Sequence, residues 1–543
     1  MPHWLLAAEA DKIQDLVFRS AHLREVMGGS ELLTQFCEQE TRQLLAGHTG
    51  RSTDEIKEDL LVHDGGSFSI VFRDQDTARR FGLVLAQAYR EQLGGALTVA
   101  EPVPWSGEVG VFKEANKASR QALVLAKRAG HGAAAVMHLP YGAFCASCGV
   151  ELAATHESQQ GDERPNYLCR FCRAKADPTL RKDFFKRVLR DLVSSFDLTT
   201  DTDKAAEGWD PRRYVAYIVA DGNGMGRVFD RCSEPDQVRI LSTALTQVLY
   251  ESVRALTKLV MYRTPASKVS EVPVVPLILG GDDVFLRLPA PYALDFARRF
   301  CQEYEERMEG VLKEIGLPNR PTISAAVVIC KSKYPHTLVH QHGKKLLAQA
   351  KRLSKKVALK GQAHSTVQVD LILGSRIVRP EDKPEENRFY PYLGPYWVCP
   401  QETEPPKKGL GLPLARLIDQ RYALRNLAAR RRSQLQKAFD PAHLPQKGED
   451  AKRWQARLEQ VIARVARGSE NRETELKAAL EQLGGSPPRY WYNVSRPGEH
   501  VFYGHGMPDL LKLWNYCLDL ERDRDAYELD LERDRDAYEP REE

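Results

Sequence analysis

Two aspartates lie at the centre of an otherwise apolar stretch, and this stretch constrains the fold more than any other part of the chain. Residues 277–286 read LILGGDDVFL, so Gly280, Gly281, Asp282 and Asp283 separate two short apolar runs. Apolar runs on both sides of a glycine-containing turn are typical of a β-hairpin. Such a hairpin is a rigid mount for two adjacent carboxylates, which are ligands that hard cations such as Mg²⁺ or Mn²⁺ prefer.

The hairpin alone does not decide the chemistry. From average residue usage, its tetrapeptide arises by chance in about one chain in a hundred of this length, and aspartate is common in solvated turns. A third acid lies upstream, where the apolar segment 214–220 is followed by Asp221, Gly222, Asn223 and Gly224. The backbone amides of such a loop can bind phosphate, although a glycine-rich loop by itself is weak evidence.

The elements around these two segments follow the order βαββαβ, which is that of a ferredoxin-like fold. In that fold the first strand lies next to the hairpin, so we expect Asp221 to face Asp282 and Asp283. Three carboxylates from two neighbouring strand ends can hold two metal ions across a reacting phosphate. The predicted elements are the strand Tyr214–Ala220, the helix Asp236–Leu259, the hairpin Val272–Leu288, the helix Tyr292–Ile315, the strand Thr322–Ile329, the helix Leu338–Lys356 and the strand Val367–Leu373.

A basic stretch follows in the same region. Residues 344–360 contain seven basic residues and no acid. Lys351 and Lys355 are four residues apart and therefore share one face of the predicted helix, where they can bind a triphosphate. Taken alone, the stretch is more simply a solvated basic face, but together with the hairpin and the glycine loop it favours phosphate binding. The three features indicate nucleotidyl transfer, in which a 3′-hydroxyl attacks an α-phosphate and pyrophosphate leaves.

Four cysteines form two C-x-x-C pairs earlier in the chain. Cys145 and Cys148 are followed, after 20 residues, by Cys169 and Cys172. This spacing lets four thiolates meet one Zn²⁺ in a tetrahedron, and a four-thiolate site has no open position, so we expect the zinc to be structural. Four free thiols are the alternative, and His156 is a weaker candidate ligand. The remaining cysteines are isolated and are expected to be ordinary core or surface residues: Cys37, Cys232, Cys301, Cys330, Cys399 and Cys517.

The first part of the chain repeats the hairpin in a weaker form. A strand that ends at Val62 leads into Asp64-Gly65-Gly66, and the strand Phe68–Phe72 follows. We therefore predict that the first and second blocks are a diverged internal pair. The other elements predicted for the first block are the strand Trp4–Ala8, the helix Lys12–Arg24, a helix that begins near the N-cap Ser30 and the helix Asp76–Leu93.

The overall composition excludes several classes of protein. The 543 residues include 78 Lys+Arg and 74 Asp+Glu, a formal charge of +4, so nucleic acid would have to be bound through local patches. No apolar run approaches the roughly 18 residues that span a bilayer, and the N-terminus lacks the features of a signal peptide. We expect a soluble cytoplasmic protein without membrane contact. The run Arg421–Lys437, with six basic residues and no acid, is hypothesised to contact RNA or a neighbouring subunit through Arg430, Arg431 and Arg432, a solvated helix face being an equal alternative.

Several segments resemble the polymerase/cyclase palm of the large subunit of type III CRISPR effector complexes. They are the GGDD hairpin, DGNGMG (221–226), TISAAVVICKSKYP (322–335) and LLAQAKRLSKK (346–356). IQDLVFRSAHLREVMGGSELL (13–33) resembles the first palm of that family. The cysteine insert lies between the palms, as in the family, and the resemblance covers nearly everything up to about residue 515.

The resemblance implies a function and assigns roles to residues. Active members of the family make cyclic oligoadenylates from ATP when the complex, built on a guide RNA with other effector subunits, binds target RNA. By position, the metal ligands (Mg²⁺ or Mn²⁺) fall on Asp221, Asp282 and Asp283. Ser67 stands where an acid is expected, so the first palm should help to bind a nucleotide without catalysing. The expected nucleotide-binding residues are Gly280, Gly281, Gly222, Asn223, Gly224, Lys351, Lys355, Gly65, Gly66 and Ser67.

We therefore predict an α+β fold: two ferredoxin-like (βαββαβ) palm domains with a zinc-binding insert between them and a C-terminal α-helical domain. The predicted domains are residues 1–143 (first palm), 144–210 (insert and helical linker), 211–400 (second palm), 401–517 (helical) and 518–543 (tail). The tail carries LDLERDRDAYE twice in succession, which is typical of a solvated helical extension or a disordered segment.

One feature departs from the family. Many members begin with a histidine–aspartate nuclease domain that cuts single-stranded DNA, whereas this sequence starts at the palm. The only His-Asp dipeptide, His63-Asp64, falls in the first hairpin, so no DNase activity is expected. Two alternatives to the synthase remain open: a scaffold subunit with an idle palm site that caps the guide-RNA complex, and a free-standing nucleotide cyclase. The three retained acids disfavour the first, and the double-palm layout disfavours the second.

Overall fold

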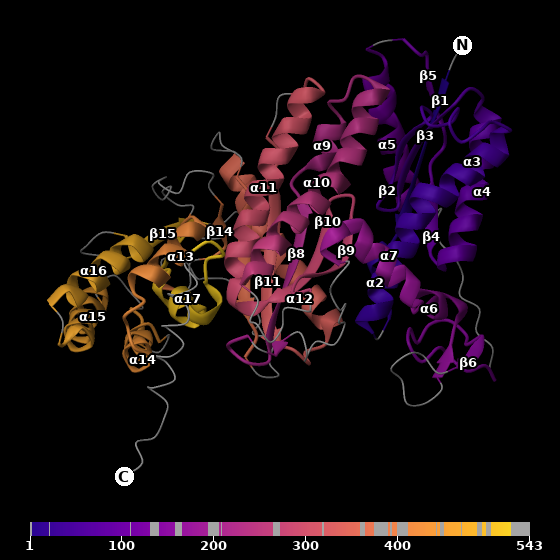
Figure 1. Cartoon of the computed structure of the whole chain (residues 1–543). Coiled ribbons are helices and arrows are strands. Elements are labelled where there is room, and N and C mark those ends of the chain that lie inside the picture. The colour runs from indigo at the N-terminus through magenta and orange to yellow at the C-terminus, as the bar shows by residue number, and fades with distance from the viewer. Residues whose placement is uncertain are drawn as a thin grey trace.

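Figure 1 shows the protein as a computed structural model, which describes residues 3–20, 22–108, 110–130, 141–157, 166–193, 206–207, 209–263, 272–317, 320–358, 364–373, 389–390, 394–398, 411–440, 443–445, 450–468, 470–485, 491–495 and 501–522. The two palm blocks lie side by side, with the cysteine insert beyond the first and the C-terminal helices beyond the second (Figure 1). Within these ranges no helix is both long and apolar enough to cross a membrane.

The first palm is built on a five-stranded antiparallel sheet with the order β2-β3-β1-β4, and β5 pairs with the start of β1. Its strands are β1 (His3–Asp11), β2 (Leu60–Asp64), β3 (Ser67–Phe72), β4 (Ala96–Val99) and β5 (Val103–Trp105). Its helices are α1 (Ile13–Phe18), α2 (Leu23–Gln35), the π-helix η1 (Phe36–Glu40), α3 (Thr41–Thr49), α4 (Gln75–Leu93) and α5 (Phe112–Arg128).

The second palm is built on a six-stranded sheet with the order β14-β12-β11-β8-β10-β9. Its strands are β8 (Tyr214–Gly222), β9 (Val275–Gly280), β10 (Asp283–Pro289), β11 (Ile323–Lys331), β12 (Thr366–Leu371) and β14 (Tyr396–Trp397). Its helices are α9 (Met225–Phe229), α10 (Pro235–Tyr262), η4 (Ala290–Tyr292), α11 (Ala293–Glu314) and α12 (His336–Ala358). The near-continuous burial of β8 and β11 reflects a sheet covered on both faces.

The two sheets share one topology. The order β4-β1-β3-β2 in the first palm corresponds to β11-β8-β10-β9 in the second, and both are the strand order of a ferredoxin-like βαββαβ unit. The predicted α+β fold class is therefore confirmed, and the two blocks have the same topology, as expected of an internal pair.

The palms pack against each other reciprocally. Helix α2 of the first palm packs on β9 of the second, and α10 of the second palm packs on β2 of the first. Each hairpin edge is thus covered by the first long helix of the other palm, which removes two open sheet edges. One hydrophobic core runs through both palms and includes Leu5 and Val71, whereas Leu6 and Ile70, on the opposite face of the same strands, belong to a core of the first palm alone.

The cysteine insert is small and is followed by a helix that returns to the palms. It consists of the short hairpin β6 (Thr155–Glu157) and β7 (Asn166–Leu168), then α6 (Arg170–Lys175). Helix α7 (Pro178–Leu189) and the 3₁₀ turn η2 (Arg190–Val193) come next, and α7 packs on α2 and α10.

The C-terminal part is mainly helical, but it is not purely so. Its helices are α13 (Leu414–Ala423), α14 (Ala429–Ala438), α15 (Asp450–Ala466), α16 (Glu470–Gly484), α17 (Met507–Lys512) and η6 (Trp514–Tyr516). A small sheet joins β13 (Phe389–Tyr390), β15 (Tyr492–Ser495) and β16 (Val501–Gly504). Sequence periodicity predicts no strands beyond Pro405; the strands there are four residues long, too short for an alternating pattern to stand out.

Two element predictions in the first palm are wrong at their boundaries. Ser30 is not an N-cap: it is buried inside α2, whose N-cap is His22. The predicted helix Lys12–Arg24 is divided between α1 and the start of α2. Predictions for Cys399, for most of the linker 197–208 and for the tail beyond residue 522 lie outside the described residues.

Candidate functional site

The acidic hairpin is closed by a two-residue turn. Gly280 and Asp283 pair across it, so Gly281 and Asp282 form the turn itself. Gly281 has φ = +58°, a conformation that costs glycine little and other residues more. The predicted hairpin is thus formed, with Asp282 at its tip and Asp283 as the first residue of β10.

Asp221 lies beside Asp283. The two residues are direct partners in the antiparallel pairing of β8 with β10, so their side chains leave the same face of the sheet. Helix α12 brings Lys351 to this point: its Nζ lies 2.5 Å from Asp221 Oδ1 and 3.4 Å from the carbonyl oxygen of Gly222. Two acids and one cation therefore meet at the ends of two neighbouring strands.

The carboxyl group of Asp282 has an unusually high pKa. Burial among protein atoms, followed by the negative charges of Asp221 and Asp283, raises its pKa to about 7, and Lys351 opposes this shift only in part. Part of the Asp282 surface is still accessible. Gly222 makes room for it, because a β-carbon added there would lie 3.2 Å from Asp282 Cβ. Asp282 therefore holds its negative charge less readily than an ordinary aspartate, and a cation bound beside it would favour the charged form.

The three carboxylates suit a hard divalent cation by their chemistry, since all are oxygen donors and their surplus charge would be relieved by one. Their oxygen atoms are not drawn together: among the described residues, only the four cysteines bring three or more potential ligands within 4.8 Å of one another. In this structure Lys351 supplies the positive charge beside Asp221.

The glycine loop after β8 is largely engaged in holding the strands together. The amide of Asn223 donates to the Thr322 carbonyl at 2.8 Å, and its side chain bonds the hydroxyls of Thr322 and Ser324 at 3.0 and 2.8 Å. The Asn223 amide is therefore not available to a phosphate. Gly224, with φ = +68°, begins the short helix α9.

Lys355, the second predicted phosphate ligand, is exposed, and Lys351 is the lysine that the structure brings to the acids.

The first palm's glycine turn meets the second palm's turn directly. A β-carbon added to Gly65 would lie 3.1 Å from the Gly281 nitrogen and 3.2 Å from its Cα. Ser67 pairs with Asp64 across the first hairpin, as Asp283 pairs with Gly280 across the second. By this register Ser67 occupies the position of Asp283.

An acid–lysine pair in the first palm corresponds to Asp221 and Lys351, and sequence analysis missed it. Ser67 faces Glu9 in the pairing of β3 with β1, and Glu9 Oε1 lies 2.7 Å from Lys127 Nζ. Each lysine is the sixteenth residue of its helix, counted from Phe112 in α5 and from His336 in α12. That shared offset is a signal that a comparison of the two blocks could have found.

A cavity of about 370 Å³ lies between the two palms next to these turns. Its walls include both hairpin turns, Glu9 and Ser67 from the first sheet, and one face of α5. On α5, Asn116 is 4 % exposed and donates from Nδ2 to the Phe229 carbonyl at 3.1 Å, and Ser119 is 1 % exposed with a hydroxyl that has no partner. A cavity of this size is in the range of small-molecule sites, and its wall mixes apolar residues with polar and charged ones such as Asp64, Asn116 and Arg120.

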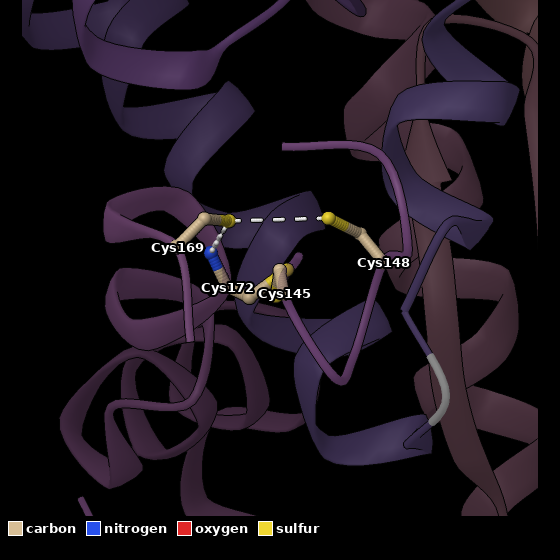
Figure 2. A group of neighbouring side chains, drawn as sticks. All are labelled: Cys145, Cys148, Cys169 and Cys172. Atoms are coloured by element: carbon tan, nitrogen blue, oxygen red, sulfur yellow. Dashed lines mark hydrogen bonds between the residues drawn. The ribbon is translucent and has the colours of Figure 1, made fainter. Parts of the chain in front are cut away.

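The four cysteines converge as their spacing predicts (Figure 2). Their sulfur atoms all lie within 4.8 Å of one another, and Cys148 Sγ and Cys169 Sγ are 3.9 Å apart. A tetrahedral zinc with bonds of about 2.3 Å separates its sulfur ligands by about 3.8 Å, so the site fits Zn²⁺. Hydrogen bonds from Cys169 and Cys172 lower the pKa of Cys148. His156 is exposed, stacks on Tyr167 and is not part of this group.

Half of the basic run of the C-terminal part is used inside the protein, while Arg425, Arg430 and Lys437 are exposed. Arg421 is 5 % exposed and donates to the Trp514 carbonyl. Arg431 donates to the Val465 carbonyl, and Arg432 lies over the Trp514 ring. Arg431 and Arg432 therefore have structural partners, which weakens the hypothesis that they contact RNA.

The sheet topology, the paired acids at adjacent strand ends and the facing lysine define a palm domain, the class of α+β domain on which nucleotidyltransferases and nucleotide cyclases are built. Residues 214–360, from β8 to the end of α12, match the family model of the Cas10/Cmr2 second palm domain. This part of the chain is thus similar to the second palm of Cas10/Cmr2, and the resemblance drawn from the motifs in this part is confirmed.

Similar solved structures are distant and longer. The Csm1–Csm4 cassette in complex with cA4 is 13 % identical over 70 % of this chain and 55 % of that chain, with a TM-score of 0.44. The Csm1–Csm4 cassette in complex with one ATP is 13 % identical over 69 % of this chain and 55 % of that chain, with a TM-score of 0.43. The Csm1–Csm4 subcomplex of the type III-A CRISPR-Csm interference complex is 14 % identical over 69 % of this chain and 55 % of that chain, with a TM-score of 0.42. This chain spans little more than half the length of those chains, and no curated protein matches it.

Proposed function

We propose that the protein is a nucleotidyltransferase that makes cyclic oligoadenylates from ATP at the second palm. The observation that carries this proposal is the meeting of Asp221, Asp283 and Lys351 beside a cavity that both palms line. An idle scaffold has no need to keep an uncompensated acid such as Asp282 at a partly buried position, because surplus buried charge costs stability.

In this proposal the second palm supplies the reacting centre. Asp221, Asp282 and Asp283 would hold Mg²⁺ or Mn²⁺, which would lower the pKa of a 3′-hydroxyl and neutralise phosphate charge. Lys351, which faces Asp221, can bind phosphate oxygens through charge-assisted hydrogen bonds. The 3′-oxygen then attacks the α-phosphate of the other nucleotide, and pyrophosphate leaves. Positioning and charge neutralisation account for most of the rate.

The first palm holds the second nucleotide without catalysing. Gly65, Gly66 and Ser67 offer backbone and a hydroxyl where the second palm has acids, and Glu9 is neutralised by Lys127. The unpaired Ser119 hydroxyl and Asn116 can hydrogen-bond a base that enters the cavity. Two nucleotides would thus meet across the contact of the two turns.

The wider setting is also a proposal. The protein acts in the cytoplasm within a guide-RNA complex of other effector subunits, target RNA triggers synthesis, and the four cysteines hold a structural Zn²⁺.

A product assay tests the enzyme. The protein, alone and in its co-purified RNA complex with target RNA, is incubated with labelled ATP and Mg²⁺ or Mn²⁺, and products are resolved by mass. We expect cyclic adenylates that disappear in the double variant Asp282→Ala, Asp283→Ala. The matched control is Asp236→Ala, because Asp236 lies on the same palm but pairs only with Arg239 at the surface. Absence of product from the complete complex would favour the scaffold function.

A further inference from the structure

Lys175 is the only lysine that is buried among the residues that the structure describes, with 5 % of its surface exposed. It is the last residue of α6 and follows Cys172 by three positions. Its Nζ donates to the carbonyl oxygen of Leu16 at 2.7 Å. Burying an ammonium group is costly unless charge and hydrogen bonds compensate it, so its position calls for a physical reason.

The cysteine knuckle, meaning residues 145–148 and 169–175, packs against glycines of the first palm. A β-carbon added to Gly28 would lie 1.9 Å from the Lys175 carbonyl oxygen, and one added to Gly29 would lie 3.4 Å from the Lys175 side chain. A β-carbon on Gly94 would lie 2.6 Å from the Phe171 ring. The knuckle therefore touches the palm with no side chain between them on the palm's side, and such a contact transmits displacements directly.

Burial lowers the pKa of Lys175, and negative groups in its surroundings oppose this effect. They are the sulfur atoms of Cys148, Cys169 and Cys172 and the carboxylate of Glu25. Four thiolates around one Zn²⁺ carry a net charge of about −2, which attracts a buried ammonium. Glu25 has no exposed surface and accepts a hydrogen bond from Ser147 of the knuckle, which adds a second link between the two parts.

Leu16 belongs to α1, a helix of six residues whose first residue lines the cavity and whose last residue contacts the second palm. Ile13, its first residue, lines the cavity, and its Cδ1 lies where a β-carbon on Gly66 would be only 2.5 Å away. Phe18, its last residue, stacks on His340 of α12 at 3.8 Å and meets Phe285 of β10 edge-on at 5.3 Å. Helix α1 thus touches the first palm's turn, the cavity and the second palm.

We propose that Lys175 is a positioning residue that ties the four-cysteine cluster to the nucleotide cavity through α1. With the cluster intact, the ammonium holds the Leu16 carbonyl and fixes α1, so Ile13 supports the Gly65–Gly66 turn. When the metal is lost, the thiolates take up protons and become neutral thiols, so the compensating charge disappears and α1 loosens. The effect on catalysis rests on the proposed function, whereas the effect on α1 does not.

Hydrogen exchange of the full chain tests the structural link. In Lys175→Met, we expect the amides of α1 to exchange at least about tenfold faster, as for loss of a hydrogen bond from a charged donor, while the zinc content stays near one equivalent. Lys182→Met is the control, because Lys182 is exposed on α7, and it should leave both values unchanged. Lys175→Arg, which keeps a cationic donor, should restore much of the protection.

The same region should respond to the metal itself. Stripping zinc from the unaltered protein with a chelator should speed exchange of α1 in the same way, and this arm remains decisive if Lys175→Met does not fold. Unchanged exchange of α1 in folded Lys175→Met, or after zinc removal, overturns the proposal.

Catalysis is a separate readout. In the RNA complex, Lys175→Met should raise the KM for ATP more than it lowers kcat, because the acids of the second palm are untouched. If the unaltered complex makes no product, the proposed function fails while the exchange of α1 still decides the link. A KM that stays at the wild-type value in Lys175→Met, despite a loosened α1, overturns the connection to the cavity.

Discussion

Lys12 has φ = +50° and Gly224 has φ = +68°, and each immediately precedes the helix that follows the first strand of its palm. The backbone at the two positions is therefore the same, while the side chains differ. The residue before each of these positions also accepts a hydrogen bond from a neighbouring strand. Thr98 donates to Asp11 at 2.6 Å in the first palm, and Ser324 donates to Asn223 in the second. The first palm keeps the backbone of the second palm's acidic site and lacks two of its acids.

Replacing Lys12 with glycine should stabilise the protein. A residue with a β-carbon in the left-handed region is strained by roughly 1 kcal/mol relative to glycine, and Lys12 is exposed, so little contact is lost. We expect Lys12→Gly to raise the free energy of unfolding by about 1 kcal/mol in urea titration. Lys12→Ala keeps the β-carbon and should give no comparable gain; equal stabilities of the two variants would contradict the strain.

Asp282 should make the metal-free protein less stable as the pH rises. Its pKa of about 7 lies above the ordinary value of 3.8, so between these values the folded state binds the proton that the unfolded state has released. The free energy of unfolding should therefore fall from about pH 4 to pH 7, and then level off. Asp282→Asn cannot ionise and should remove this slope, with a gain of at most about 4 kcal/mol at pH 8, the free energy that corresponds to the difference between the two pKa values.

The check is denaturant unfolding of both proteins at several pH values in a chelating buffer. Asp236→Asn serves as the control, since Asp236 is exposed and ion-paired at the surface. A wild-type slope that persists unchanged in Asp282→Asn would show that another group causes it.

At the level of elements, the sequence pattern predicted those helices and strands whose position depends on neighbouring residues in the chain. The second hairpin, β8, α10, α11, β11, α12 and β12 were each predicted to within a few residues, because their apolar runs are long and their turns carry glycine. Helix α2 was missed at its start because its N-cap, His22, makes no capping hydrogen bond with its side chain, so no sequence signal marks it. Ser30 resembled a cap but is used to pack α2 in the interior.

The contact of α2 with α6 predicts a sharp difference between two glycines. Gly28→Ala would place a β-carbon 1.9 Å from the Lys175 carbonyl oxygen, so we expect a loss of about 3 kcal/mol in the free energy of unfolding from overpacking. Gly47→Ala in α3 meets nothing within 4 Å, and its better helix propensity should add about 0.5–1 kcal/mol. Thermal or urea unfolding of both variants measures this; a similar response at the two positions would contradict the close docking of the knuckle.

At the level of the whole molecule, the site depends on how the palms meet, and that could not be predicted from the sequence. The three acids were predicted from the hairpin and from the end of the preceding strand, and the register of β8 with β10 places Asp221 beside Asp283 as expected. The cavity, the Gly65–Gly281 contact and the role of Ser119 depend on packing between residues more than 100 positions apart, for which no local pattern exists. Glu9 and Lys127 look like ordinary surface charges until their strand and helix are paired.

The shared core predicts that the two palms unfold together. Leu5, Val71 and Phe112 of the first palm belong to the same buried cluster as β8 and β10 of the second. Native-state hydrogen exchange should therefore give β3 and β10 opening free energies that agree within about 1 kcal/mol, as for one cooperative unit. Opening of β3 at a much lower free energy, with β10 still protected, would show that the palms are separate units.

The two turns that face each other across the palm interface, at Gly65 and Gly281, have consequences for protein engineering. Main-chain atoms alone set the gap between the two halves of the site, so no side chain there can be exchanged to widen it by small steps. For the proposed activity, libraries aimed at a different nucleotide or a different ring size would gain little at these glycines. They should instead vary the wall that α5 contributes, where Asn116, Ser119 and Leu123 can change shape without moving either turn.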